Sequence, residues 1–436
     1  MESIVVYSAA NSTRLKYVLD WLLKERLHLS YSITNDVEAT NGLPFFIAYG
    51  KPLPKSISIP DTGMLWKNGM KICDPATAAW KDIPALFASP GGEYTLPFDL
   101  FSAIFFLLSR YEEYYPFVPD KHGRYPAVNS ILYKNGWLQR PLADEWVYAF
   151  SKELQAATGI TIPATSFSFQ PTYDVDMAYS HLHKGIRRIA GAYMRALVKM
   201  KLGQISERTQ VLKNKQKDPY DSFRWLRQLH KEYDCKPIYF ILAAFKTTAF
   251  DKNIHPTHPA MMRVIKNIVR DGAIGVHPSY YSDEGDTVSK EKKILENISG
   301  RNITISRQHY IRVKTPETYR MLMKNDITED YSMGYGSHLG FRAGTGNSFY
   351  WYDLENDTIT PLRIHPFCFM DTTAHFEAKL SPSEAFDKLN AMSKILEKTG
   401  STMTTIFHNF SLGTASEWKG WRSAYEHFLG EKARVM

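Results

Sequence analysis

The chain has 436 residues, of which 44% are hydrophobic and 22% charged, so it is long enough for a barrel with an additional domain. Its net charge of +8 favours anionic partners such as phosphates, nucleic acid or acidic lipid, without choosing among them. Its three cysteines, Cys73, Cys235 and Cys368, form no CxxC pair, which argues against a disulfide framework and against a cysteine zinc site.

The first residues, MESIVVYSAANSTRLKYVLDWLL, predict a buried strand rather than a signal peptide. The apolar run at residues 4–10 is short, and no basic leader precedes it. No window reaches the ~18 apolar residues that a membrane span requires. We therefore expect a cytoplasmic protein, with peripheral attachment to the inner membrane as an open alternative.

Residues 1–160 predict a separate α/β domain of unknown role. Its predicted strands lie at residues 4–7, 29–34 and 45–49, and its predicted helices at residues 12–26, 97–113 and 142–158. Prolines and glycines break residues 51–95 into short strands and loops. The segment SAANS after the first strand is not GxGxxG, so the sequence does not support a nucleotide-binding domain.

The most informative stretch is FSFQPTYDVDMAY at residues 167–179, which predicts a strand that ends in two carboxylates. Asp174 and Asp176 lie two residues apart in extended chain, so both point to the same side. Two like charges this close are costly unless a cation or a proton separates them. The pair is therefore either a solvated surface turn or a site in which one carboxylate binds a metal and the other acts as a base.

Residues 161–436 alternate between predicted strands and helices, which favours a parallel sheet closed into a (β/α) barrel. In such barrels the chemistry lies at the C-terminal ends of the strands. The polar side chains at or near those predicted ends are Asp174, Asp176, His277, His309, Arg342, His365 and His408.

A basic segment at residues 184–217 interrupts this alternation. Lysines and arginines alternate there with apolar residues such as Ile186, Tyr193 and Leu197 at helical spacing. Such a segment can lie on an anionic membrane surface or bind a phosphate-bearing substrate. It can equally be an ordinary surface helix with its basic side in water, and both interpretations stay open.

An aspartate and two histidines around one divalent ion, with positions left open for water, make a hydrolytic site. The ion polarises a carbonyl group and lowers the pKa of bound water. A second carboxylate can then take a proton from that water, and a histidine opposite can protonate the leaving group. The chain offers all these residue types and has no GxSxG nucleophile motif. Each histidine taken singly can also be structural.

The segments TYDVD, GVHPSY, GFRAG and TIFHN, in this order across about residues 165–415, resemble the motifs of NodB-type polysaccharide deacetylases. These are metal-dependent carbohydrate esterases with a distorted (β/α) barrel. The whole chain also resembles deacetylase-like proteins of bacterial surface-glycan loci, through SRYEEY at residues 109–114 and DKHGRYPA at residues 120–127. The resemblance implies removal of N-acetyl groups from an amino-sugar glycan or a lipid-linked glycan precursor, with zinc as the metal and cobalt or nickel as alternatives.

By this resemblance, Asp174 is the catalytic base and Asp176 a metal ligand. Arg342 in GFRAG corresponds to the family arginine that orients the base, although Gly344 replaces the proline of that motif. His408 in TIFHN corresponds to the late histidine that acts as the general acid.

The second family motif usually supplies two metal-binding histidines four residues apart. Here His277 matches the first, but Tyr281 occupies the second position. We expect His309, in SRQHYIR, to replace the missing ligand, with His365 as the reserve. The side chains of Tyr350, Trp351 and Trp418 are either walls of a sugar pocket or core residues.

Two alternatives to deacetylation stay open. One is a related amidase or deformylase-like hydrolase that uses the same site on a different acyl group. The other is a catalytically inactive barrel that acts as a glycan-binding or scaffolding subunit, for which the change at Tyr281 is the main support. No nucleic-acid partner is expected, because the sequence carries no recognised nucleic-acid-binding signature.

Overall fold

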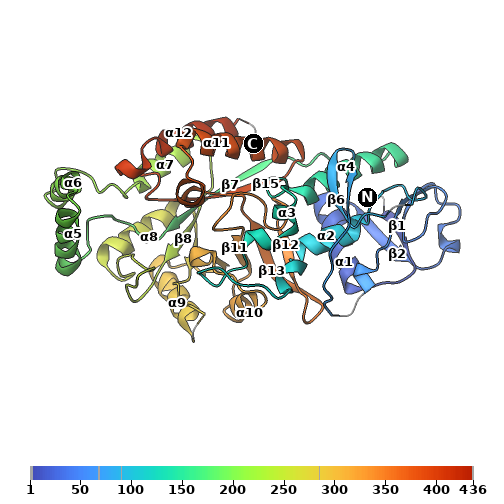
Figure 1. Cartoon of the computed structure of the whole chain (residues 1–436), viewed down its shortest axis with the longest axis horizontal. Helices are drawn as coiled ribbons and strands as arrows, with labels where there is room; N and C mark the ends of the chain where they lie inside the picture. Colours follow the sequence, from blue (N-terminus) through green and yellow to red (C-terminus); the bar gives the residue numbers. More distant parts are fainter. Residues whose placement is uncertain (1–2, 67–68, 90, 284, 435–436) are drawn as a thin grey trace.

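The computed structural model describes residues 3–66, 69–89, 91–283 and 285–434. The described residues form a four-stranded sheet, a nine-stranded sheet and a two-stranded sheet, together with helices that cover them (Figure 1). The four-stranded sheet lies at the right of Figure 1, and the nine-stranded sheet occupies the centre. None of the described helices is both long enough and apolar enough to cross a membrane.

The N-terminal region begins with the predicted strand–helix–strand unit. Helix α1 (Thr13–Leu19) starts at Ser12, whose side chain accepts a hydrogen bond from the backbone N–H of Leu15, and it continues into a π-helical segment, Asp20–Arg26. The four parallel strands follow the order β2-β1-β3-β4. Their bounds are β1 (Ser3–Ser8), β2 (Ser30–Thr34), β3 (Phe46–Tyr49) and β4 (Ser56–Ile59). The antiparallel pair β5 (Thr77–Trp80) and β6 (Ile83–Leu86) follows.

Helix α2 (Leu100–Leu108) is buried along its whole length, and its N-terminal cap is the carboxylate of Asp99. It is shorter than the helix predicted at residues 97–113, because Arg110 adopts a left-handed backbone conformation and a 3-10 turn follows at Tyr111–Tyr114. After the short helix α3 (Ile131–Lys134), helix α4 (Leu142–Thr158) has the predicted bounds. It ends at Gly159, whose positive φ of 69° suits glycine.

The nine-stranded sheet has the order β12-β13-β11-β10-β9-β8-β7-β15-β14, and only β12 runs antiparallel to its neighbour. Its strands are β7 (Ser168–Val175), β8 (Ile238–Leu242), β9 (Ala273–His277), β10 (Ile305–Ser306), β11 (Glu329–Met333), β12 (Phe349–Asp353), β13 (Thr358–Pro366), β14 (Phe369–Met370) and β15 (Thr402–His408). The helices between them are α5 (Ile186–Val198), α6 (Leu202–Leu212), α7 (Phe223–Glu232), α8 (Pro259–Asp271), α9 (Thr287–Ser299), α10 (Glu317–Lys324) and α11 (Pro382–Lys398), and α12 (Trp421–Lys432) follows the last strand.

The prediction of a closed barrel is wrong for the described strands, because the sheet is curled but open. Strand β14 pairs only with β15, and β12 pairs only with β13. Strand β14 has only two residues, and just before it Phe367 and Cys368 donate backbone hydrogen bonds to Met333 of β11 and Thr404 of β15. Helices α1 and α2 of the N-terminal region pack against β13 and β12, so they cover the open side.

The two predicted domains share one buried apolar cluster, which runs from β1 to α12. Hydrogen bonds also join them: the indole N–H of Trp21 donates to the carbonyl of Ser348 at 3.1 Å, and the hydroxyl of Tyr17 donates to the carbonyl of Tyr350 at 2.7 Å. The N-terminal region is therefore packed as part of the same folded unit as the large sheet.

Candidate active site

The parallel strands bring the predicted site residues to one edge of the large sheet. The register of β7 and β15 pairs Asp174 directly with His408, and β9 ends at His277. Asp176 follows β7, and His309 opens the short turn after β10. All five side chains line one cavity of about 300 Å³.

Three of these side chains form a group with metal-ligand geometry. One ligand atom from each of Asp176, His277 and His309 lies within 4.8 Å of the others. The Nε2 atom of His277 is 3.2 Å from Oδ1 of Asp176, and the Nε2 atom of His309 is 3.6 Å from its Oδ2. Oδ1 of Asp176 is buried and has no hydrogen-bond partner among the described residues. An unpartnered buried carboxylate oxygen beside two imidazole nitrogens fits a divalent cation.

The other ring nitrogen of each histidine is already engaged. Nδ1 of His277 lies 2.6 Å from the carbonyl oxygen of Arg307, and Nδ1 of His309 lies 3.0 Å from a carboxylate oxygen of Asp251. Nε2 of each ring is left to face Asp176. Metal-binding histidines are commonly held by such outer hydrogen bonds.

The electrostatics of the group favour a cation between these residues. Burial by itself would raise the pKa of Asp176, but His309, His277 and His408 hold it well below its usual value. Burial would lower the pKa of His309, but the carboxylates of Asp176 and Asp251 raise it to about 9. The charge of Asp176 therefore stabilises a positive group at this point, either a proton on His309 or a metal ion.

Asp174 lies beside this group and is held by Arg307. Nη1 of Arg307 lies 2.8 Å from Oδ1 of Asp174, and Nε of Arg307 donates to the carbonyl of Tyr331 at 3.0 Å. The other carboxylate oxygen, Oδ2, is 3.7 Å from Nε2 of His277. Asp174 is thus fixed by a buried, charge-assisted hydrogen bond with one oxygen facing the metal-ligand group.

The expectation that Arg342 orients Asp174 is wrong. Arg342 forms a bidentate pair with Glu113, with distances of 2.8 Å and 2.6 Å, and it does not line the cavity. Glu113 belongs to the N-terminal region, and the motifs from which the role of Arg342 was expected do not include that region. Arg307, which directly follows β10, occupies the orienting position instead.

His408 also lies beside Asp176. Its Nε2 atom is 3.5 Å from Oδ2 of Asp176, and its Nδ1 atom is 2.6 Å from Oδ1 of Asp371. Burial by itself would lower the pKa of His408, but Asp371, with help from Asp176 and Asp174, raises it to about 9. A protonated imidazole at neutral pH suits a general acid.

The reserve ligand His365 is not part of this group. It stacks on Tyr331 at 4.2 Å, and its Nε2 atom lies 2.8 Å from a carboxylate oxygen of Glu329. Tyr281 is 48% exposed and does not line the cavity. The predicted sugar-pocket walls Trp351 and Trp418 are core residues. The aromatic rings that do line the cavity are those of Phe250, Tyr310, Phe376 and Phe410.

The N-terminal region contributes part of the cavity wall through Lys121, His122 and Arg124. Nδ1 of His122 lies 2.9 Å from the hydroxyl of Tyr280, and Nη1 of Arg124 donates to the carbonyl of Tyr310 at 2.8 Å. In the sequence, DKHGRYPA served only as a mark of family resemblance, so this contribution was missed. Asp251 and Asp371 were missed as well, because no motif connects them to the histidines they hold.

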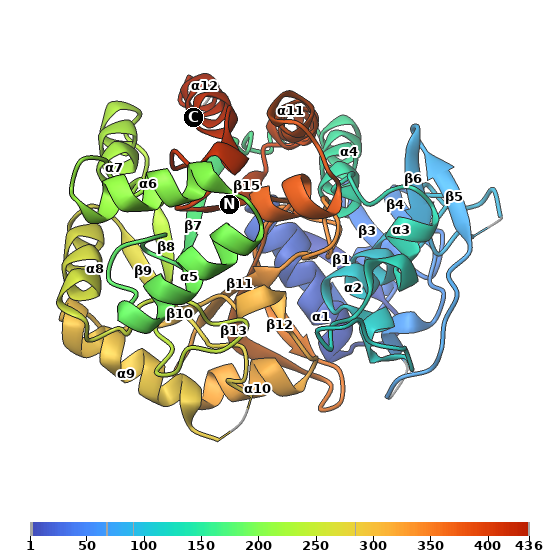
Figure 2. The same ribbon diagram turned by 60° about the vertical axis from the view of Figure 1, so that its left-hand side comes forward.

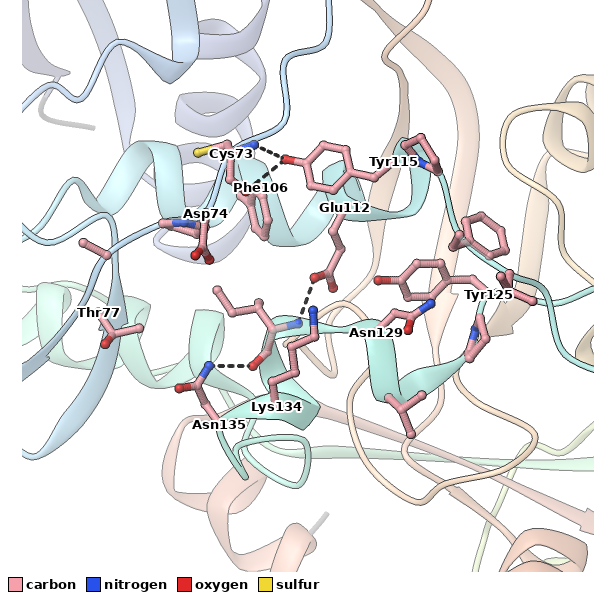
Figure 3. A pocket seen from close by; sticks show the side chains of 18 residues that line it. Cys73, Asp74, Thr77, Phe106, Glu112, Tyr115, Tyr125, Asn129, Lys134 and Asn135 are labelled. Atoms are coloured by element: carbon pink, nitrogen blue, oxygen red, sulfur yellow. Dashed lines mark hydrogen bonds between the residues drawn. The ribbon is translucent and has the colours of Figure 1, made fainter.

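A larger cavity, of about 1030 Å³, lies entirely within the N-terminal region (Figure 3). Tyr115 accepts a hydrogen bond there from the backbone of Cys73, and the carboxylate of Glu112 accepts one from the backbone of Ile131. None of its lining residues belongs to the Asp176, His277 and His309 group. The group with metal-ligand geometry therefore lines the smaller cavity and not this one.

Comparisons with known proteins give two results. Residues 4–159 match a family of unknown function (DUF7033), and no curated protein matches the chain. Solved structures that resemble the chain include proteins assigned as polysaccharide deacetylases. One from Mycobacterium smegmatis is 18% identical, with a TM-score of 0.38, and the match covers 63% of this chain and 86% of that one.

Two further structures show similar values. One from Pseudomonas aeruginosa is 12% identical, with a TM-score of 0.38, over 61% of this chain and 84% of that one. A polysaccharide deacetylase from Bacillus cereus is 11% identical, with a TM-score of 0.30, over 62% of this chain and 88% of that one.

Proposed function

We propose that this protein is a metal-dependent hydrolase that removes N-acetyl groups from an amino-sugar glycan or a lipid-linked glycan precursor. The observation that carries the proposal is the grouping of Asp176, His277 and His309 beside a held carboxylate, Asp174, and a held imidazole, His408. The order of the sequence motifs supports the choice of an acetylated amino sugar as the substrate.

Asp176, His277 and His309 would hold one divalent ion, with zinc favoured and cobalt or nickel as alternatives. When bound, the ion polarises the acetyl carbonyl group and lowers the pKa of a water molecule. The three ligands supply a single negative charge, so the site keeps a net positive charge that stabilises the developing oxyanion.

Asp174 would take the proton from the attacking water. Arg307 holds one of its oxygens, which leaves the other to face the metal-ligand group. His408 would donate its Nε2 proton to the nitrogen of the leaving amine, because Asp371 holds the opposite side of the ring. Amide hydrolysis requires both a base for the water and an acid for the leaving amine, and Asp174 and His408 would fill these two roles.

The alternative of an inactive scaffold loses its main support, the tyrosine at position 281. That side chain lies outside the cavity, and His309 provides a second imidazole next to Asp176. The related amidase or deformylase-like hydrolase would use the same residues as the deacetylase, so variants cannot separate the two. A panel of substrates with different acyl groups can.

The test is acetate release from N-acetylchitotetraose by zinc-loaded protein. Asp174→Asn is expected to lower kcat by roughly 10²-fold or more, because the base is lost while the metal ligands remain. Asp286→Asn, at a side chain that is 70% exposed, is the matched control and is expected to keep full activity. Release of formate but not acetate from the matching N-formyl sugar would select the rival hydrolase. No acyl release from any member of the panel by metal-loaded protein would contradict the proposal.

A further inference from the structure

Helices α5 and α6 form a hairpin at the left end of the molecule in Figure 1, opposite the N-terminal region. Figure 2 shows the same pair from a second direction, as a separate layer in front of the strands. The two helices contact each other: each has one buried residue, Ala196 on α5 and Val211 on α6, and the hydroxyl of Tyr193 is 2.9 Å from that of Thr209. The hairpin is therefore a preformed element rather than a loose loop.

The tip of this hairpin exposes large apolar side chains. Val198 is 80% exposed, Met200 85% and Leu202 69%, and Met194 and Leu197 beside them are more than half exposed. Ile186, on α5, is also exposed. Elsewhere in the described chain, exposed large apolar residues are scattered over many elements. A cluster of this kind marks a surface that has a partner.

The same segment is strongly basic. Ten of residues 184–217 are lysine or arginine, whereas only Glu207 is acidic, so this segment alone carries more positive charge than the net +8 of the whole chain. The one acidic side chain is engaged by Nε2 of His181 at 2.8 Å. Arg195, Lys199 and Lys201 lie among the exposed apolar residues of the tip and are themselves exposed.

We propose that the α5–α6 hairpin docks on an anionic lipid bilayer, with its apolar tip in the interface and its basic side chains on the lipid headgroups. Exposed apolar residues flanked by lysines and arginines are the combination that binds such surfaces, since burial of the apolar groups adds to the attraction of the charges. A nucleic-acid partner would use the charges but would leave the apolar tip in water. The surface therefore fits a membrane better than it fits RNA or DNA.

The hairpin is also joined to the wall of the catalytic cavity. Nη2 of Arg188 donates to the carbonyl of Lys252 at 2.9 Å, and Lys252 lines that cavity. Docking would accordingly bring the cavity close to the bilayer surface and to substrates that are anchored there by lipid. This consequence rests on the proposed function, whereas the docking itself does not.

The experiment is co-sedimentation with phosphatidylcholine vesicles that do or do not contain about 30 mol% phosphatidylglycerol. We expect binding at least roughly tenfold tighter to the anionic vesicles. Leu197→Ser with Val198→Ser, and separately Arg195→Glu with Lys199→Glu, should each weaken that binding by at least roughly tenfold. All four side chains are exposed, so the fold is expected to be unaffected.

Two matched controls carry the same chemical changes elsewhere on the surface. Ile72→Ser with Val118→Ser removes apolar side chains that are 78% and 83% exposed, and Lys394→Glu with Lys398→Glu reverses exposed charges on α11. Both should bind anionic vesicles like the unaltered protein. Equal loss in the controls, or no binding to anionic vesicles at low salt, would overturn the proposal.

Two other occupants of the surface give distinct results. A dimer in solution that Leu197→Ser with Val198→Ser dissociates would show that a second copy covers the tip, and tight binding to single-stranded RNA without vesicle binding would show a nucleic-acid surface. Either result would overturn the proposal. Acetate release from soluble N-acetylchitotetraose should be the same in the hairpin variants and the unaltered protein, so a failure of docking is distinguishable from a failure of the proposed function.

Discussion

At the scale of single residues, the site depends on groups that hold other groups. Asp251 and Asp371 hold His309 and His408, and Arg307 holds Asp174. Arg307 is fully buried, and its guanidinium group also lies 4.2 Å from the centre of the ring of Phe240. Its planar shape is therefore needed as well as its charge.

The first prediction compares two buried arginines. Arg307→Lys keeps a positive charge but loses the fixed hydrogen bond to Asp174, so we expect kcat to fall by roughly 10²-fold while zinc content is unchanged. Arg342→Lys, the matched control, disturbs the pair with Glu113 and should lower stability rather than the kcat of the folded protein. Steady-state kinetics and thermal unfolding of both variants check this. A loss of kcat in Arg342→Lys alone would instead restore Arg342 as the orienting residue.

The sequence was sufficient to identify the aspartates and histidines that face the cavity, but neither the rest of the cavity wall nor the residues that hold this group from behind. Asp174, Asp176, His277, His309 and His408 each follow or end a predicted strand, so strand periodicity alone brings them to one edge. Asp251 lies in a loop, where no strand pattern marks it. Two arginines, Arg307 and Arg342, are candidates in the sequence for orienting Asp174. Their contacts depend on how separate strands pack, which the local pattern does not contain.

At the scale of elements, the predicted strands and helices agree with the structure to within a few residues wherever the alternation was strong. The differences have local causes. The basic segment forms two helices rather than one, because Met200 adopts a left-handed backbone conformation between them. The prediction that the large sheet closes was wrong. Closure depends on which strands the last strands pair with, whereas the sequence pattern indicates only that these strands exist.

The second prediction concerns the start of α11. Ser381 accepts a hydrogen bond from the backbone of Glu384, whose side chain accepts one in return from the backbone of Ser381. Ser381→Ala removes half of this capping box, so the free energy of unfolding should fall by about 1 kcal/mol. Ser423→Ala is the control, because its hydroxyl donates to the carbonyl of Gly420, just before its own helix, and caps no backbone N–H. Urea denaturation measures both, and an equal loss in the two variants would argue against the cap.

At the scale of the whole molecule, the N-terminal region and the large sheet are held together by buried charge as well as by apolar packing. Glu113 accepts hydrogen bonds from Arg342 of the large-sheet region and from Arg110 of its own region. Burial by itself would raise the pKa of Glu113, but Arg342 and Arg110 lower it from 4.5 to about 2. This carboxylate therefore stabilises the folded state when it is ionised.

The third prediction uses that shift. Glu113→Gln leaves the buried guanidinium of Arg342 without its carboxylate and that of Arg110 with Glu112 alone, so we expect the unfolding free energy at pH 7 to fall by about 3–5 kcal/mol. A carboxylate with a lowered folded-state pKa contributes stability above its unfolded pKa and loses it as the pH falls. The difference between Glu113→Gln and the unaltered protein should therefore shrink as the pH falls from about 4.5 towards about 2. Denaturation at several pH values checks this, and a constant difference would contradict the ion pair.

The proposed hydrolase depends on a bound metal, and the most direct measurement is metal content after incubation with zinc, cobalt or nickel and removal of excess ion. The unaltered protein should retain about one divalent ion per chain. Asp176→Asn and His309→Ala should lose it, whereas Asp174→Asn and His365→Ala should keep it, because only the first two remove a proposed ligand. An unaltered protein that retains none of the three metals, or a His309→Ala variant that retains the ion while His365→Ala loses it, would contradict the metal site described above.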